Sequence, residues 1–385
     1  MTFSGQPVTR RAFWDVASVG HAEDGQQFFV PFLTDMSCGI AGYREGVMDS
    51  ILRAPSAILR LLEDQGVGEV WVPAASWAEM WRWKAISRDV PIAPDAFAGG
   101  PILVDVEPTS DRQRWIRDRS DLSSALGIIE QENSGWVILQ SDDMDFAQMV
   151  SRDAKSMGLR VGLRGSMEAA TVLMDGDLYC GLPNINRSSL NQSLTDLMMS
   201  WSQDSLNETL NAARAMLSRG VMISTELITL HRAVFVKESL DTPFLEFNEP
   251  ILPHVRWLIQ MRRTGGFAAG KSALFEYSGL REPSRSQVPL LKNGWDRLVE
   301  SAVTLFLEFE GLRPGSGAPQ LAVIPGRGLR EELALLHVSG VPVQDVLMRA
   351  SSGIAGRSGS NSRWLATAAC PEDGARFIMS LRPQQ

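Results

Sequence analysis

The chain has 385 residues, with 37 Lys and Arg against 45 Asp and Glu, which gives a formal net charge of −8. Apolar residues make up 44% of the sequence, including 11 Trp, so disorder as the main state is excluded and two or three domains are expected. No uncharged apolar run reaches the roughly 18 residues of a membrane span, and the N-terminus lacks the apolar core of a signal peptide. We therefore expect a soluble, cytoplasmic protein with no membrane partner.

The first half of the chain alternates short apolar runs with stretches of helical periodicity, a pattern that predicts α/β layers. The candidate strands lie at residues 28–33, 69–73, 102–106, 136–140 and 159–163. Because these runs lack strict polar alternation, we expect a mostly parallel sheet with both faces covered by helices. Residues 1–182 are acidic, with 16 Lys and Arg against 26 Asp and Glu, whereas the rest of the chain carries 21 against 19.

The pattern becomes mainly helical after residue 182. Helices are predicted at residues 190–201, 205–220, 224–238 and 295–309. Residues 326–385 then hold two short helical patterns and two strand-like runs at 363–368 and 375–381, which is the order of a winged helix, with a small packing module as the alternative. The expected organisation is an α/β domain over 27–182, a helical, more basic region over 183–325 and a small α+β module over 326–385.

Cysteine and histidine residues indicate neither a disulfide framework nor a structural zinc site. Cys38, Cys180 and Cys370 lie far apart, and the four histidines show no metal-ligand spacing. We expect core thiols and ordinary histidines.

The strongest local signal is a buried strand that ends in Ser141-Asp142-Asp143-Met144-Asp145-Phe146, followed by a helix and a second strand after Gly158. This order brings acidic side chains to the carboxyl edge of a parallel sheet, where α/β folds bind ligands. Carboxylates gathered there repel one another unless a cation neutralises them, and oxygen ligands suit Mg²⁺ or Mn²⁺. The alternative is that the acids cap the following helix.

This run resembles the NYN branch of the PIN-like nuclease superfamily. The matching residues are Ser141, Asp143, Asp145 and Phe146, then the segment 158–161 and, further on, Asp177; Asp121 and Asp35 match upstream acids of that family. Asp142 stands where the family has Gly, and Cys38 lies near the place of a common Asn. The resemblance covers residues 27–182 and is strongest over 119–180.

The resemblance implies a PIN-like sheet and Mg²⁺ or Mn²⁺ bound by Asp35, Asp143 and Asp145, with Asp121 and Asp177 as further catalytic acids. A metal-bound water would then attack a phosphodiester bond.

A second motif, Gly265 to Ser272, matches the pattern of a phosphate-binding P-loop, with Gly270, Lys271 and Ser272 as its candidate contacts. The sequence before it has helical rather than strand periodicity, so a flexible loop at a helix end is the alternative.

The surroundings of this motif are basic. Residues 254–297 hold eight Lys and Arg against three acids, interleaved with aromatic residues, which is typical of a surface that binds single-stranded nucleic acid. The candidate contacts are Arg256, Arg262, Arg263, Lys271, Arg281 and Arg285. A solvated helix face is the alternative.

Together these features predict a metal-dependent nuclease, or a nuclease-derived binding protein, that acts on RNA or single-stranded DNA. Two alternatives stay open. One is a non-catalytic assembly or regulatory protein that binds another protein or a second copy of itself, and the other is a P-loop NTPase.

Overall fold

The fold is given by a computed structural model, which describes residues 28–31, 33–35, 62, 64–72, 85, 95–98, 100–108, 113–132, 134–187, 192–203, 206–235, 260–261, 263–272, 283–317, 323–324, 326–351, 364–367 and 374–383.

A parallel sheet of seven strands lies at the centre, in the order β11-β10-β9-β8-β7-β5-β6. Its strands are β5 (Ile102–Val104), β6 (Gln113–Trp115), β7 (Trp136–Gln140), β8 (Arg160–Arg164), β9 (Leu178–Tyr179), β10 (Met222–Ser224) and β11 (Leu312–Arg313). The parallel sheet predicted for the first half is confirmed, and β7 has the predicted bounds.

A second parallel sheet contains β2 (Leu33–Asp35), β3 (Val67–Val72) and β4 (Asp95–Ala98). β4 pairs with β3, and β5, which follows β4 closely in the chain, pairs with β7. β6 pairs only with β5, at the end of the seven-stranded sheet. With β6 set aside and β4 and β5 taken as one position, each strand from β2 to β11 lies beside the next in chain order, which is the order of an α/β barrel. Within the described residues no ladder joins β11 to β2.

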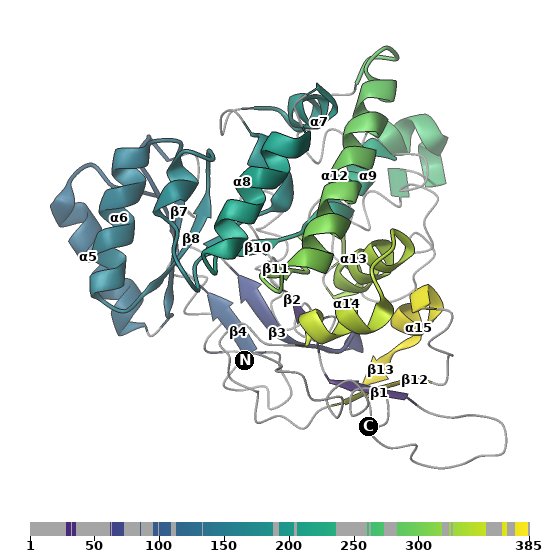
Figure 1. Ribbon diagram of the computed structural model, residues 1–385, viewed down its shortest axis with the longest axis horizontal. Helices are drawn as coiled ribbons and strands as arrows, with labels where there is room; N and C mark the ends of the chain where they lie inside the picture. The colour runs from purple at the N-terminus through teal and green to yellow at the C-terminus, as the bar shows by residue number, and fades with distance from the viewer. Residues whose placement is uncertain are drawn as a thin grey trace.

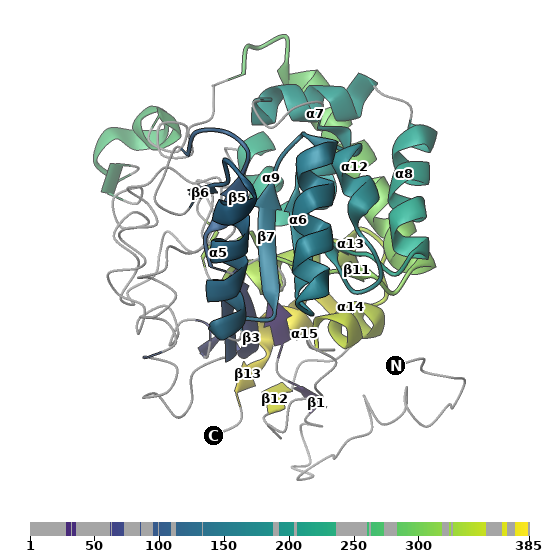
Figure 2. The same ribbon diagram turned by 90° about the vertical axis from the view of Figure 1, so that its left-hand side faces the viewer.

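Helices cover the outer side of these parallel sheets, with α5 and α6 in front of β5 and β7 in Figure 2. The described helices are α5 (Arg119–Gln131), α6 (Met144–Ser156), α7 (Leu194–Gln203), α8 (Leu206–Ser218), α9 (Leu227–Val234), α12 (Val288–Glu308), α13 (Arg327–Val338), α14 (Val343–Ala350) and α15 (Gly374–Ser380), with the short helices η1 (Ala169–Val172) and η2 (Leu182–Asn186). Among these helices none has both the length and the apolar character needed to cross a bilayer.

The strands are apolar along their whole length because both of their faces are buried. Val137 and Leu139 of β7 belong to the large core under the helices, whereas Trp136 and Ile138 pack with Ile102, Val104, Leu178 and Cys180 in a second cluster on the opposite face. Alternate residues of a strand point to opposite faces, so the second cluster lies on the inner face of the seven-stranded sheet. This explains why the strand sequences lack polar alternation.

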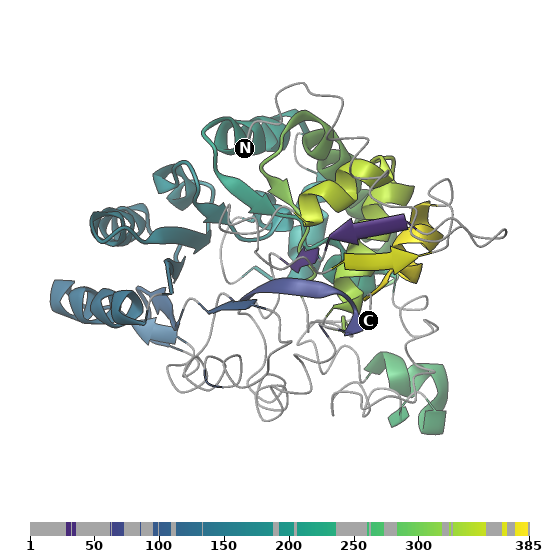
Figure 3. The same ribbon diagram turned by 90° about the horizontal axis from the view of Figure 1, so that it is seen from below.

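The first described strand and the last two form a small antiparallel sheet, which lies at the lower edge of the molecule in Figure 1 and faces the viewer in Figure 3. It consists of β1 (Phe28–Pro31), β12 (Trp364–Thr367) and β13 (Arg382–Pro383). The strand predicted at 363–368 is confirmed, but the one predicted at 375–381 is wrong, since these residues form α15 and bury Phe377 and Ile378 against α13. The helix replaces the second strand that a winged-helix hairpin requires.

The sheet also takes strands from both sides of residue 182. β10 and β11 lie in the region predicted to be mainly helical, and both pair in parallel with their neighbours. The domain limits at 182 and 325 stay predictions. The predicted helices at 190–201, 205–220 and 295–309 correspond to α7, α8 and α12.

A buried arginine connects the segment before β3 to the helices α13 and α15. Arg330 of α13 is fully buried and donates from Nε and Nη2 to the carbonyl oxygen of Gln65, just before β3, at 2.8 and 2.6 Å. Its Nη1 lies 3.4 Å from the carbonyl oxygen of Met379 in α15. Burial lowers the pKa of Arg330 to about 9, so the guanidinium stays charged at neutral pH.

Replacing Arg330 by Met should therefore destabilise the protein by about 1–3 kcal/mol, because the carbonyl of Gln65 loses its donors inside the protein. Urea denaturation measures this change. The control Arg214→Met removes an exposed ion pair with Glu308 and should shift the urea midpoint far less. Equal shifts for the two variants would contradict the structural role of Arg330.

Candidate functional site

The register of the parallel sheet brings the carboxyl ends of its strands to one edge. Gln140 of β7 lies opposite Arg164 of β8, and Ile223 of β10 lies opposite Tyr179 of β9. Arg164 has the same parity along β8 as Gly162, which pairs with Ile138 of the inner face, so Arg164 points to the inner side. Folds of this strand order carry their active sites at this edge.

Two close contacts fix the carboxyl ends of β5, β7 and β8. The hydroxyl of Ser141 donates to Asp105 Oδ2 at 2.6 Å, which links the ends of β7 and β5. A Cβ atom at Gly165 would lie 1.9 Å from the carbonyl oxygen of Ser141, so only glycine fits there. The strand ends are thus held tightly against one another.

Four charged side chains gather at this edge, namely Asp142 after β7, Arg164 at the end of β8, Arg187 after η2 and Glu226 after β10. We refer to these four residues as the charge cluster. Burial, together with the nearby charge of Arg164, lowers the pKa of Arg187 to about 10, and Asp142 and Glu226 partly oppose this shift. Arg164, Asp142 and Glu226 therefore lie close enough to Arg187 for their charges to act on it.

Glu226 has an unusual backbone conformation. Its φ is 52°, and no other non-glycine residue of the described chain has a positive φ. Its Oε1 accepts a hydrogen bond from Ser224 Oγ at 2.8 Å, and Ser224 Oγ in turn accepts one from the N–H of Gly181 at 2.8 Å. Left-handed backbone at a non-glycine residue costs free energy and is concentrated at functional sites, so Glu226 is a candidate functional carboxylate.

A second carboxylate supports Glu226 from behind. Glu332 of α13 is fully buried and accepts hydrogen bonds from the Thr225 hydroxyl and from the N–H groups of Leu227 and Ile228, at the start of α9. Burial raises the pKa of Glu332 to about 7, and the three hydrogen bonds partly oppose this shift. Glu332 therefore fixes the residues on both sides of Glu226.

The predicted metal ligands Asp143 and Asp145 lie at the same edge but are exposed. Asp143 is the N-cap of α6, and its Oδ1 accepts hydrogen bonds from the N–H groups of Asp145 and Phe146 at 2.8 and 3.1 Å. Asp145 lies in the first turn of that helix. This is the capping geometry that the sequence left open as the alternative.

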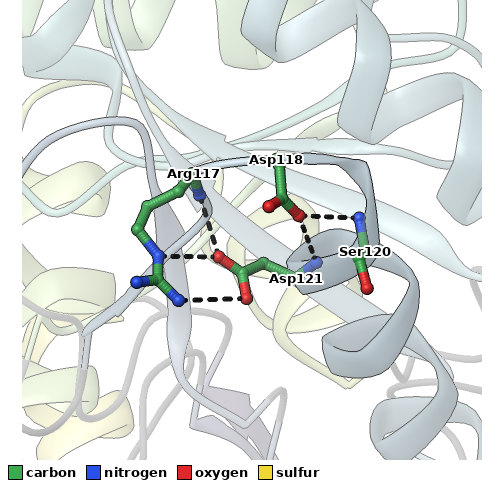
Figure 4. A network of polar contacts seen from close by, with 4 residues as sticks. All are labelled: Arg117, Asp118, Ser120 and Asp121. Carbon is green, nitrogen blue, oxygen red and sulfur yellow. Dashed lines mark hydrogen bonds and ion pairs between the residues drawn. The ribbon is translucent and has the colours of Figure 1, made fainter.

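Asp121 also lies at a helix start. Figure 4 shows Arg117 paired with Asp121, and Asp118 accepting hydrogen bonds from the N–H groups of Ser120 and Asp121. The hydrogen bond from Arg117, 2.9 Å from Nε to Oδ2, holds the pKa of Asp121 below its ordinary value. These contacts stabilise the first turn of α5.

Asp177 lies at the opposite edge of the sheet from the charge cluster. It precedes β9, accepts from the N–H of Val161 at 2.9 Å and pairs with Lys155 at 2.9 Å. Its side chain is buried. The structure therefore places Asp177 apart from Asp143 and Asp145 and gives it contacts that join α6, β8 and β9.

The remaining predicted site residues are described only in part. The side chain of Asp35 and all of Arg256, Arg262 and Arg281 lie outside the described residues. Arg263 and Arg285 are exposed. Residues 263–272, which include Gly270, Lys271 and Ser272, are helical, so they do not form the open loop that cradles phosphates in a P-loop.

No family model and no curated protein matches the sequence, but solved structures match the fold. Bottromycin amidohydrolase superposes with a TM-score of 0.66 and 14% identity, over 92% of this chain and 75% of that chain. A putative prolidase from Bifidobacterium longum superposes with a TM-score of 0.57 and 13% identity, over 94% of this chain and 82% of that chain. An Xaa-Pro dipeptidase with methionine bound in its active site superposes with a TM-score of 0.55 and 12% identity, over 92% of this chain and 84% of that chain.

These likenesses correct the interpretation drawn from the sequence. At such low identity they show the fold alone, and that fold is of the amidohydrolase and prolidase type rather than PIN-like or NYN. The expected nuclease, with RNA or single-stranded DNA as its partner, is therefore wrong. A strand, an acidic turn and a helix occur in many α/β folds, which is why the short run at 141–146 was misleading.

A divalent metal ion is compatible with this fold, whereas the expected Mg²⁺ or Mn²⁺ stays a prediction. The described residues at the strand ends do not suit one. Among the described residues, no three His, Cys, Asp or Glu side chains are grouped so that they could hold a metal ion. Burial raises the pKa of the Cys180 thiol, which keeps it protonated, and Asp142 and Glu226 lie beside two cations.

Sequence reasoning missed Arg164, Arg187, Glu226 and Glu332. The signal for Arg164 was present, since Arg164-Gly165 follows the predicted strand at 159–163. Glu226 was hidden because β10 has three residues and its last one was assigned to a helix. No local signal marks Arg187 or Glu332, whose neighbours are distant in the sequence.

Glu332 makes the free energy of unfolding depend on pH, and the direction of this dependence follows from its pKa. Its pKa of about 7 in the folded protein lies above the ordinary value of 4.5. Its contribution to stability is therefore full below about pH 4.5 and is lost as the pH rises through about 7. Glu332→Gln should lack this loss, so its unfolding free energy should rise relative to the wild type by up to about 1.4 kcal/mol per pH unit over that window.

Urea denaturation at several pH values checks this prediction, with the exposed Glu130→Gln as the control. Parallel stability curves for the wild type and Glu332→Gln would contradict it.

Proposed function

We propose that the protein is a hydrolase of small amides or peptides whose active site lies at the carboxyl ends of β7–β10. The observation that carries this proposal is the strained Glu226 within the charge cluster, at the edge where folds of this strand order hold their active sites. The similarity in fold to bottromycin amidohydrolase, the putative prolidase and the Xaa-Pro dipeptidase supports the substrate class.

Glu226 is the proposed general base. It takes a proton from a water molecule, and the water oxygen forms a bond to the carbonyl carbon of the substrate. The C–N bond then breaks, and the proton passes from Glu226 to the leaving nitrogen. The products are a carboxylic acid and an amine, so the atoms of one water molecule are added in each turnover.

The surroundings of Glu226 suit this role. Ser224 Oγ holds Oε1, and a Cβ atom at position 181 would lie 3.1 Å from Oε2, so the carboxylate lies directly against Gly181. Glu332 holds Thr225 and the first N–H groups of α9, which keeps the backbone around Glu226 in place. A general base fixed in this way does not have to be ordered again when the substrate binds.

Glu226→Gln should lower kcat by at least about 100-fold, because the amide cannot accept the proton from water. A panel of dipeptides and N-acyl amino acids, with the released amine quantified by mass spectrometry, provides the measurement. The control Glu300→Gln changes an exposed glutamate of α12 and should keep full activity. No hydrolysis across the panel, or full activity in Glu226→Gln, would contradict the proposal.

A further inference from the structure

The two arginines of the charge cluster come from different elements and are held in different ways. Arg164 ends β8, with its backbone fixed by the pairing to Gln140 and by the close approach of Gly165 to Ser141. Arg187 follows η2, where its N–H donates to the carbonyl oxygen of Asn184 at 2.9 Å. Both side chains are half-buried.

The turn that carries Arg187 is held by hydrogen bonds from several sides. The hydroxyl of Tyr179 lies 2.9 Å from the carbonyl oxygens of Gly165 and Asn184, and Asn184 Nδ2 donates to the carbonyl of Cys180 at 2.6 Å. Trp201 Nε1 donates to the carbonyl of Pro183 at 2.9 Å. This network fixes the backbone position of Arg187 relative to the end of β8.

The charges of the cluster are arranged for a polar ligand. The Nε atoms of Arg164 and Arg187 and Oδ1 of Asp142 are buried from solvent. Burial and Arg164 both lower the pKa of Arg187, yet at about 10 it leaves the guanidinium charged at neutral pH. Two like charges held together by the fold favour a negatively charged group between them, and Asp142 and Glu226 offer acceptors for the N–H groups of the same ligand.

We infer that Arg164 and Arg187 bind a carboxylate of the substrate directly and that this site binds its ligand without a divalent metal ion. Guanidinium groups match the geometry of a carboxylate through paired N–H donors, and they supply the positive charge that a metal would otherwise bring. The unsuitable donor set at the described strand ends points the same way. The inference rests on the proposed function for its substrate class.

Binding of two matched probes tests the inference. N-acetyl-L-alanine carries a carboxylate, and N-acetyl-L-alanine amide is its uncharged counterpart. Isothermal titration of the full chain in the presence of EDTA should show saturable binding of the carboxylate at least about 10-fold tighter than that of the amide. Mass spectrometry of the untreated protein should find far less than one Zn or Mn per chain.

Variants connect this binding to the two arginines. Arg164→Gln and Arg187→Gln should each weaken carboxylate binding by about 10-fold or more, and Arg187→Lys should only partly restore it because a lysine lacks the paired donors. Arg285→Gln removes an exposed arginine outside the cluster and should bind as the wild type does. Circular dichroism of each variant shows whether it folds, and the wild-type comparison of the two probes decides the inference even where a variant does not.

Three results would overturn the inference: equal affinity for the two probes, no saturable binding of the carboxylate, or binding that EDTA abolishes and Zn²⁺ restores. Its failure is distinguishable from failure of the proposed function. Hydrolysis that depends on a bound metal would retain the function and refute the inference. Metal-free carboxylate binding without hydrolysis of any substrate would retain the inference and refute the proposed function.

Discussion

The in-register parallel pairing from β7 to β10 is the constraint on which the site depends. Because the strands run in the same direction, their carboxyl ends fall at one edge, and Arg164, Gly181 and Glu226 meet there although they lie far apart in the sequence. Gly165 and Gly181 permit the close contacts that this edge requires. A shift of one residue between β7 and β8 would turn Arg164 toward the outer helices and separate the charge cluster.

The same edge combines rigid support with local strain. Glu332 holds Thr225 and the start of α9, and Glu226, which lies between Thr225 and Leu227, keeps a left-handed backbone that few side chains adopt. The free energy that this conformation costs is offset by the hydrogen bonds around it, so the carboxylate keeps one position against Gly181. At the other edge of the sheet, Asp177 and Arg330 join elements of the scaffold, which is consistent with a division between a functional edge and a stabilising edge.

The α/β class and the parallel sheet of the first half could be predicted from the sequence, whereas the strand order of the whole sheet and the site could not. Apolar runs of about five residues such as 136–140 give a strong strand signal, and the parallel sheet followed from them. β9, β10 and β11 have two or three residues each, too few to show a period of two, so the continuation of the sheet past residue 182 was not visible. Asp143 was predicted to be a metal ligand because aspartate serves both to cap helices and to coordinate metal ions. Only the geometry of the side chain separates the two roles.

A crystal structure of the full chain with N-acetyl-L-alanine bound, grown without added metal, tests the central claim most directly. The account predicts carboxylate oxygens of the ligand within about 3 Å of guanidinium nitrogens of both Arg164 and Arg187, with the amide carbonyl carbon on the side of Glu226. A ligand bound elsewhere, or a metal ion between the strand ends that contacts the carboxylate in place of the arginines, would contradict it.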